Sequence, residues 1–415
     1  MTSVSPDGSV PSVAILIDDL VAWHGFAGQP TGIQRAASEV LDTALRRTDV
    51  RAWPAASIVG LRSDQPRLLE IERGSLRWAS PEGQTPRQLT ILRSARGVVS
   101  RAPLPSLTRT WMKRLYGRLT VYTLGGRDAQ SADLLLVPGA FWIGEMATRI
   151  PQLVRQGIPV RALVYDLFPP TRPESFEPAL RDDFEHAMDA VIPICDRIVT
   201  LGESPARELV ARYPSVSDRV RAAVPDLHAH SPKTSGAGDH GAIEVRPIPS
   251  PYILALSTVE PRKNHRLILD AWRLYRSRKP IGTLVIVGRR GWETGEIEDE
   301  IGRDAASFQI VRIESVTDTE LEALYAGAAA TVHASWAEGF GLPVRESVAR
   351  GITTLVSTGI PRDGLPEDQV ELFAPHDSNR LSYLIEEALT FRGPRRPVVT
   401  GAGTGWEPMV SALLD

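Results

Sequence analysis

Short apolar runs alternate with amphipathic stretches throughout the second half of the chain. The runs are rich in β-branched residues and bounded by turn formers, which is typical of buried strands in a parallel sheet. Six such strands are predicted, at residues 252–257, 283–288, 309–313, 330–335, 353–357 and 370–374. Helices are predicted between and after them, at residues 264–278, 295–306, from 318 onward, 342–350 and 378–391. This alternation predicts an open parallel sheet with helices on both faces.

The first half shows the same pattern in a weaker form. Apolar strands are predicted at residues 13–18, 134–138, 160–165 and 197–201, and an amphipathic helix at residues 31–45. Between the halves, residues 229–250 are polar and glycine-rich and then proline-rich, which is typical of a linker or a flexible loop. We therefore predict an α/β chain of two doubly wound domains, residues 1–228 and 251–415, joined by that linker.

Length and composition agree with a large globular protein and exclude several classes. At 415 residues the chain is long for one core, so two domains are expected. The formal net charge of −3 gives no general case for nucleic-acid binding. Cys195 is the single cysteine, which excludes an intrachain disulfide and fits a reducing cytosol. No apolar run approaches transmembrane length and the N-terminus lacks a signal-peptide pattern, so a cytoplasmic protein is expected.

The stretch Glu338-Gly-Phe-Gly-Leu-Pro-Val-Arg-Glu346 carries the most specific chemistry. It follows a predicted strand, and Pro343 suits the first turn of the helix that comes next. A glycine turn at this place lets backbone N–H groups and the positive helix end approach an anion. Either glutamate alone is better explained as an acidic residue that suits the helix dipole. The whole nonapeptide between strand and helix favours a site for a phosphate with sugar hydroxyls beside it.

This nonapeptide resembles the donor-binding signature of glycosyltransferase family 4, the group 1 retaining glycosyltransferases. The resemblance covers nearly all of residues 252–415 and scattered parts of the first half. It implies the GT-B fold, in which two doubly wound Rossmann-like domains face a ligand-binding cleft. It also implies transfer of a hexose from a nucleoside-diphosphate sugar to a glycan acceptor, with no metal and no cofactor. GDP-mannose is the first donor that it suggests, in bacterial surface polysaccharide assembly.

Ser257-Thr-Val-Glu-Pro-Arg-Lys-Asn-His265 is similar to the family's second donor motif. Lys263 matches a lysine that contacts the diphosphate, whereas Thr258 stands where many members have an arginine. Arg262 can supply that charge, as in the family's Glu-Pro-Arg-Lys-Asn variants. Fixed cations stabilise the negative charge that the leaving diphosphate gains. A solvated basic loop is the alternative interpretation, and it is the weaker one at the carboxyl end of a strand.

Parts of the first half and the closing segment also resemble the family. Residues 29–35 are similar to its glycine loop, of whose glycine pair Gly32 is present. Residues 165–169 resemble a His-Asp segment that points at the reacting sugar, with Tyr165 in place of the histidine. Asp166 remains, either to orient a hydroxyl or to form a turn, and the two interpretations are balanced. Trp406 is expected to pack against a domain.

The resemblance implies a role for each matched residue. Lys263 and Arg262 neutralise the diphosphate, Glu338 binds hydroxyls of the donor sugar, and Glu346 accepts hydrogen bonds from the ribose. The predicted catalytic set consists of Lys263, Arg262, Glu338 and Asp166. The other predicted donor contacts are Gly32, Thr258, Gly339, Phe340, Gly341 and Leu342. No nucleophile is assigned, because the resemblance implies attack from the face that the diphosphate leaves, with a diphosphate oxygen taking the acceptor's proton.

One segment of the first half has an unusual charge pattern. Residues 84–127 contain nine basic residues and no acidic one. Within them, leucines and Trp111 recur every four residues, while Arg109, Lys113, Arg114 and Arg118 project elsewhere. This pattern predicts a basic amphipathic helix that docks on an anionic membrane and places the enzyme over a lipid-linked acceptor. A surface helix with solvated arginines is an equally weighted alternative.

Two other classes of protein remain open. A Rossmann-type dehydrogenase needs a G-x-G-x-x-G after a strand, and Gly288-Arg-Arg-Gly291 does not supply it. A catalytically decayed GT-B protein that still binds a nucleotide sugar or a glycan fits Thr31, Tyr165 and Thr258, which stand where the family often has functional residues. Retention of Glu338, Glu346 and Lys263 favours an enzyme.

Overall fold

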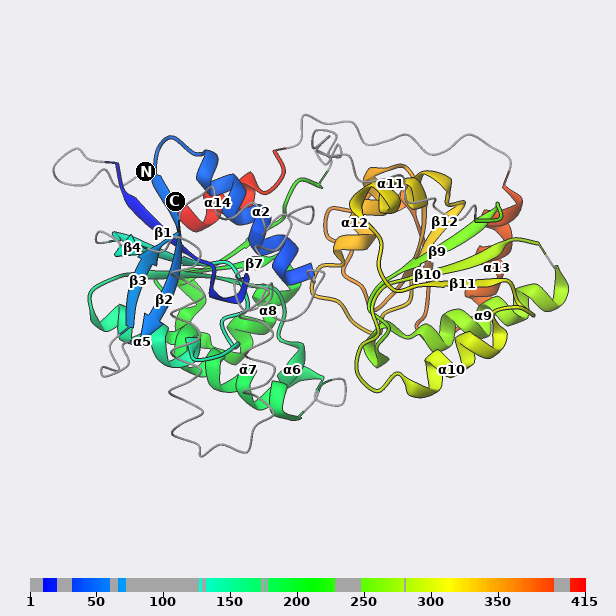
Figure 1. Cartoon of the computed structure of the whole chain (residues 1–415), viewed down its shortest axis with the longest axis horizontal. Helices are drawn as coiled ribbons and strands as arrows, with labels where there is room; N and C mark the ends of the chain where they lie inside the picture. The colour runs from blue at the N-terminus through cyan, green and yellow to red at the C-terminus, as the bar shows by residue number, and fades with distance from the viewer. Residues whose placement is uncertain are drawn as a thin grey trace. The chain divides into compact units, whose positions relative to one another are not determined.

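The computed structural model describes most of the chain as two compact units. The described residues are 10–20, 32–59, 66–71, 127–128, 132–172, 176, 178–227, 248–279, 281–391 and 404–415. Unit 1 comprises Met1–Pro225 and Trp406–Asp415, and unit 2 comprises Asp226–Gly405. Each unit is built on one twisted sheet with helices packed against it (Figure 1).

Unit 2 contains a parallel sheet of six strands. Neighbouring strands pair in parallel throughout it. In spatial order the strands are β11 (Ile310–Ile313), β10 (Thr283–Val287), β9 (Tyr252–Leu256), β12 (Ala330–His333), β13 (Thr353–Ser357) and β14 (Val370–Phe373). The strand order reverses between β9 and β12, which makes their carboxyl ends the topological switch point, where ligands bind in open α/β sheets.

The helices of unit 2 explain why its strands are apolar on both faces. They are α9 (His265–Arg278), α10 (Gly295–Asp304), α11 (Asp318–Gly327), α12 (Leu342–Ala349) and α13 (Ser378–Thr390), with short 3-10 turns η6 (Pro261–Lys263) and η7 (Glu367–Gln369). Ile253 and Ala255 of β9 pack in a core with α9, α10 and α13. Leu254, which points the other way, packs with Tyr325 of α11. Figure 1 shows α9 and α13 together and α11 and α12 elsewhere around the sheet.

The elements predicted for the second half are confirmed with small differences at their ends. Residues 353–357 form a strand as predicted, and the other five strands each end one or two residues earlier than predicted or begin one later. A capping box begins α11: the Thr317 hydroxyl accepts from the Glu320 N–H, and the Glu320 carboxylate accepts from the Thr317 N–H. The predicted linker at residues 229–250 lies almost wholly outside the described residues.

Unit 1 has an eight-stranded sheet that is parallel except at one edge. The strands in spatial order are β4 (Arg127–Asp128), β3 (Pro66–Glu70), β2 (Arg51–Val59), β1 (Ser12–Leu16), β5 (Leu134–Val137), β6 (Val160–Val164), β7 (Arg197–Leu201) and β8 (Val220–Ala223). The β2–β3 and β3–β4 pairs are antiparallel. The order reverses between β1 and β5, so this unit has its own switch point.

The described helices of unit 1 cover both faces of this sheet. They are α2 (Gly32–Arg46), α5 (Met146–Arg155), α6 (Phe168–Thr171), α7 (Pro178–Val191), α8 (Glu203–Arg212) and α14 (Glu407–Leu414), with 3-10 turns η3 (Ile192–Ile194) and η4 (Pro214–Arg219). Phe184 of α7 and Ile150 of α5 lie in one core with β1, β5 and β6. Val40 of α2 and Val410 of α14 are also fully buried.

The end of the chain belongs to unit 1, which corrects the predicted domain of residues 251–415. Trp406 is 3% exposed, and Met409 and Leu413 in α14 are fully buried. Arg161 of β6 donates to the Leu413 and Leu414 carbonyls at 2.7 Å, so it satisfies the free carbonyls of the helix end. The sequence indicates a closing helix, but it does not show that the chain returns to the first sheet.

The structure confirms the α/β class with two Rossmann-like units. In the described ranges, no helix combines the length and apolar character needed to cross a bilayer.

Candidate functional site

The carboxyl ends of β9 and β12 lie next to each other at the switch point of unit 2. The β9 end leads through residues 257–260 into η6, and the β12 end leads through residues 334–341 into α12. These two loops carry both predicted donor motifs. A pocket between them is lined by Ser257 and Lys263 of one motif, by Glu338, Gly341 and Pro343 of the other, and by His333 and Ser335 at the end of β12. The structure therefore brings the two motifs to one place.

Hydrogen bonds fix the two loops to each other. The Trp336 N–H donates to the Arg262 carbonyl at 2.9 Å, and the Arg262 guanidinium donates to the Ala337 carbonyl at 3.0 Å. The Asn264 amide donates to the Ala334 carbonyl at 3.2 Å. A Cβ at Gly359 would lie 2.1 Å from the Trp336 carbonyl oxygen, so only glycine allows this approach. The backbone of the site is consequently held from both sides.

Glu338 is the centre of a half-buried charge cluster. It forms ion pairs with Lys263 and with Arg262, the latter at 2.9 Å. The Ser335 hydroxyl donates to the same carboxylate at 2.6 Å, and Arg262 also pairs with Glu260 at 2.9 Å. Burial alone raises the pKa of Glu338, but Arg262, Lys263 and the two hydrogen bonds outweigh it and bring the pKa well below the usual range. Glu338 is thus an anion at any physiological pH.

The histidines at this site are neutral. Burial, helped by Arg312 and Lys263, lowers the pKa of His265 to about 3. Burial also lowers the pKa of His333 to about 3, because the opposing effect of Glu338 is smaller and Lys263 lowers the pKa further. His265 contacts the Ser257 hydroxyl at 3.3 Å. The side-chain positive charge at this pocket therefore comes from lysine and arginine.

The glycine turn before α12 forms an open helix end. Gly341 is the N-cap with φ 73°, a left-handed conformation that favours glycine. A Cβ at that position would also lie 2.9 Å from Ile360. No side chain caps the helix, and Pro343 is in its first turn. Uncapped N–H groups and the helix dipole together form the local structure that binds phosphate groups in proteins.

Glu346 lies in α12 on the side that faces α11, apart from the Glu338 cluster. Its carboxylate accepts from the Tyr325 hydroxyl at 3.2 Å. Arg350 stacks on the Tyr325 ring at 4.6 Å and donates to the Glu346 backbone carbonyl at 2.7 Å. The two carboxylates of the nonapeptide therefore have different surroundings: Glu338 lies in the charge cluster with Arg262 and Lys263, and Glu346 lies against Tyr325 of α11.

The remaining predicted contacts have varied outcomes. Thr258 is partly exposed and lies against the loop that follows β10, since a Cβ at Gly291 would be 3.1 Å from its methyl group. Gly32 is the exposed first residue of α2, and residues 21–31 before it are outside the described ranges.

The Asp166 carboxylate accepts a hydrogen bond from the Phe168 N–H at 3.2 Å, which agrees with the interpretation that Asp166 forms a turn. The Tyr165 hydroxyl is buried and donates to the Pro138 carbonyl at 2.5 Å.

The basic segment cannot be placed. Arg109, Trp111, Lys113, Arg114 and Arg118 lie in residues 72–126, outside the described part of the chain. Its predicted membrane contact stays a prediction.

Sequence reasoning missed a pair of acidic residues at the switch point of unit 1. Asp18, the last residue of the predicted strand 13–18, and Asp19 come just after the end of β1 at Leu16. Asp18 accepts from the Ser57 N–H at 2.8 Å and pairs with Arg149 at 3.6 Å. Asp19 accepts from the Ala140 N–H at 3.0 Å, and Gly139 packs directly on its carboxylate. The signal was available, because two carboxylates at the carboxyl end of a strand indicate a polar edge of the sheet.

Asp19 makes the stability of the protein depend on pH. Burial raises its pKa to about 6, and the hydrogen bonds from Ala140 and Leu20 oppose this only in part. The folded state then holds a proton that the unfolded state has lost between pH 4 and 6, so stability falls as pH rises through this range. We expect Asp19→Asn to become more stable relative to wild type by roughly 2.5 kcal/mol from pH 4 to pH 7.

Urea unfolding at several pH values measures this difference. Asp218→Asn is the matched control, because the Asp218 carboxylate is 83% exposed and its replacement should leave the pH dependence unchanged. If the free energies of unfolding of wild type and Asp19→Asn change equally between pH 4 and 7, the raised pKa of Asp19 is contradicted.

Comparisons with known proteins agree with this site. The model of the family "Glycosyl transferases group 1" matches residues 242–398, which contain both motifs. The Escherichia coli serotype-specific mannosyltransferase WbdA is 26% identical over 226 residues, covering 51% of this chain and 27% of that protein. The Escherichia coli O-antigen chain mannosyltransferase B is 33% identical over 142 residues, covering 33% of this chain and 36% of that protein. The matches thus span about a third or less of these relatives.

Solved structures show the fold of the whole chain. Sucrose-phosphate synthase from Thermosynechococcus elongatus has a TM-score of 0.58 at 18% identity, covering 98% of this chain and 95% of that one. Anabaena HepE in complex with UDP-glucose has a TM-score of 0.56 at 12% identity, covering 97% and 92%. Both similarities extend over both units. The model of the group 1 glycosyl transferases thus matches this chain over residues 242–398, and the two Rossmann-like units have the GT-B fold.

Proposed function

We propose that this protein transfers a hexose, with mannose as the first candidate, from a nucleoside-diphosphate sugar to a glycan acceptor with retention of anomeric configuration. The observation that carries the proposal is the cluster of Lys263, Arg262 and Glu338 beside the uncapped start of α12. Cations and N–H groups meet there, as a departing diphosphate requires, with a permanent carboxylate next to them for sugar hydroxyls.

The chemistry follows from the charges. The bond between the sugar's anomeric carbon and the diphosphate oxygen breaks with its electron pair on the diphosphate. Lys263 and the N–H groups at Gly341 and Leu342 stabilise that charge, so the proposal needs no metal ion. The acceptor oxygen forms the new bond on the same face, and its proton passes to the departing diphosphate oxygen. Glu338 holds the sugar, and Glu346 holds the ribose.

Mannose is proposed from the relatives, and GDP from the sequence resemblance to the family. The two Escherichia coli relatives described above are named as mannosyltransferases, and one of them is named for O-antigen chains. We therefore propose a role in bacterial surface polysaccharide assembly, on the cytoplasmic side of the membrane. Docking of residues 84–127 on anionic lipid is part of this proposal and rests on the sequence alone.

A panel of donors tests the proposed function. We expect GDP-mannose to give the fastest release of nucleoside diphosphate, increased by an acceptor extract and changed less than twofold by a chelator, when compared with UDP-glucose and a 6-deoxyhexose donor. The transferred sugar should keep the donor's anomeric configuration in an NMR spectrum of the product. Tight donor binding without any release would instead support the catalytically decayed GT-B protein, which Tyr165 and Thr258 keep open.

A further inference from the structure

Arg345 is a buried cation that the proposed reaction has not yet used. It is the fourth residue of α12, and only 6% of it is exposed. Its guanidinium lies 3.7 Å from the centre of the Phe340 ring, and its Nε donates to the Phe340 carbonyl at 3.3 Å. The side chain therefore folds back onto the glycine turn and holds the Phe340–Gly341 peptide through the Phe340 ring and carbonyl.

The surroundings of this guanidinium are unfavourable to its charge. It lies at the positive end of a helix, where a cation is repelled. Its Nη2 is buried and has no hydrogen-bond partner. Burial lowers the pKa of Arg345 to about 10, and the opposing field of Asp363 is too weak to restore it. No carboxylate among the residues that the structure describes forms an ion pair with it.

The other cations near the turn are already balanced. Lys263 and Arg262 share the Glu338 carboxylate. Arg350, at the opposite end of the same helix, pairs with Glu322 and donates to a helix carbonyl. Arg345 is thus the buried charge at the start of α12 that lacks an anion in this structure. A bound phosphate at the turn would offset both the cost of burying this charge and its repulsion by the helix, because it supplies the missing anion.

We propose that Arg345 is a positioning residue for the diphosphate of the nucleotide: it holds the Phe340–Gly341 peptide so that the turn's N–H groups face the anion, and its charge adds to the positive end of α12. This inference rests on the proposed function, since it assumes that the α12 turn binds the nucleoside diphosphate. The contacts of Arg345 run through Phe340, so it acts on the anion through the turn.

Binding measurements on the full chain separate this role from a merely structural one. GDP and UDP are titrated into wild type and Arg345→Met by calorimetry, and guanosine and uridine are titrated by NMR, which detects millimolar affinities. We expect Arg345→Met to weaken diphosphate binding at least fivefold and to leave nucleoside binding within twofold. Loss of the fold at the turn would weaken both classes of ligand alike, and that result would overturn the proposal.

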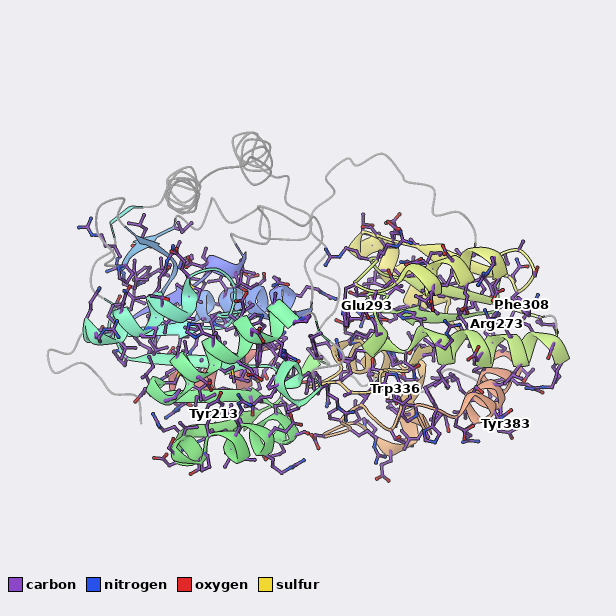
Figure 2. All side chains as sticks on the ribbon, turned by 90° about the horizontal axis from the view of Figure 1, so that it is seen from below. Tyr213, Arg273, Glu293, Phe308, Trp336 and Tyr383 are labelled. Atoms are coloured by element: carbon purple, nitrogen blue, oxygen red, sulfur yellow. The ribbon has the colours of Figure 1, made fainter. Side chains whose placement is uncertain are left out.

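Two further variants complete the test. Arg273→Met removes the same charge from α9, where Arg273 pairs with Asp304 and Glu300, and should leave both affinities unchanged. Figure 2 shows Arg273 apart from Trp336, which marks the site loop. Arg345→Lys keeps the charge but loses the planar stack. The ratio of its diphosphate affinity to its nucleoside affinity should stay above half of the wild-type ratio. This variant tests the role of the charge even if Arg345→Met fails to fold.

The possible failures are distinguishable. Wild type that binds neither GDP nor UDP would refute the proposed function and this inference with it. Wild type that binds a diphosphate with an affinity unchanged by Arg345→Met would refute the inference alone.

Discussion

Lys263→Met is expected to lower the rate of sugar transfer by about a hundredfold or more at saturating donor. Lys263 is the cation that lines the pocket at the start of α12, where the diphosphate is proposed to gain charge. That interaction is stronger in the transition state than in the ground state, so its loss lowers the turnover number. Glu338 stays paired with Arg262 and Ser335 in the variant, so the loop is expected to keep its structure.

Steady-state kinetics at varied donor concentration check this prediction. Lys263→Arg is the matched control: it keeps the charge but replaces a compact ammonium with a planar fork, so an intermediate rate is expected. A folded Lys263→Met protein with a turnover number near that of wild type would remove Lys263 from the reaction.

Glu338→Gln is expected to separate turnover from binding. A charged hydrogen bond to a sugar hydroxyl contributes about 1.5–3 kcal/mol, so turnover should fall about ten- to a hundredfold. The variant also removes the anion that occupies Lys263 and Arg262 in this structure. Because Lys263 is then no longer paired with Glu338, we expect the nucleoside diphosphate product to bind at least as tightly as to wild type.

Glu346→Gln is the natural comparison for this variant. Its proposed ribose contact is equal in ground and transition states, so the donor's Michaelis constant should rise while turnover is nearly kept. Initial rates and product-inhibition constants of the two variants decide the matter. If Glu338→Gln weakens diphosphate binding and spares turnover, the roles assigned to the two glutamates are wrong.

Much of unit 2 was predictable because its sequence signals are local. Its strands are continuous apolar runs between turn residues, and the Thr317 capping box marks a helix start without ambiguity. Unit 1 was harder for physical reasons. Strand β2 has Pro54 in its middle and little β-branched character, and α5 contains Pro151. Tertiary pairing with β1 and packing on the core decide these elements, and neither is visible in local sequence.

The site was predictable in its members and only partly in its contacts. The resemblance assigned Lys263 and Glu338 to one donor site, and the structure pairs the two side chains. Glu338 forms ion pairs with both Lys263 and Arg262. This arrangement depends on the left-handed backbone at Asn264 and on the hydrogen bond between the Trp336 N–H and the Arg262 carbonyl. The burial of Arg345 under Phe340 likewise depends on three-dimensional packing.

A crystal structure of the full chain with bound GDP or UDP tests the central claim most directly. The account predicts that the diphosphate lies within hydrogen-bond distance of Lys263 Nζ and of the N–H groups at the start of α12, with the ribose at Glu346. A nucleotide bound away from that turn, or a diphosphate at the turn that leaves Lys263 paired with Glu338 alone, would contradict it.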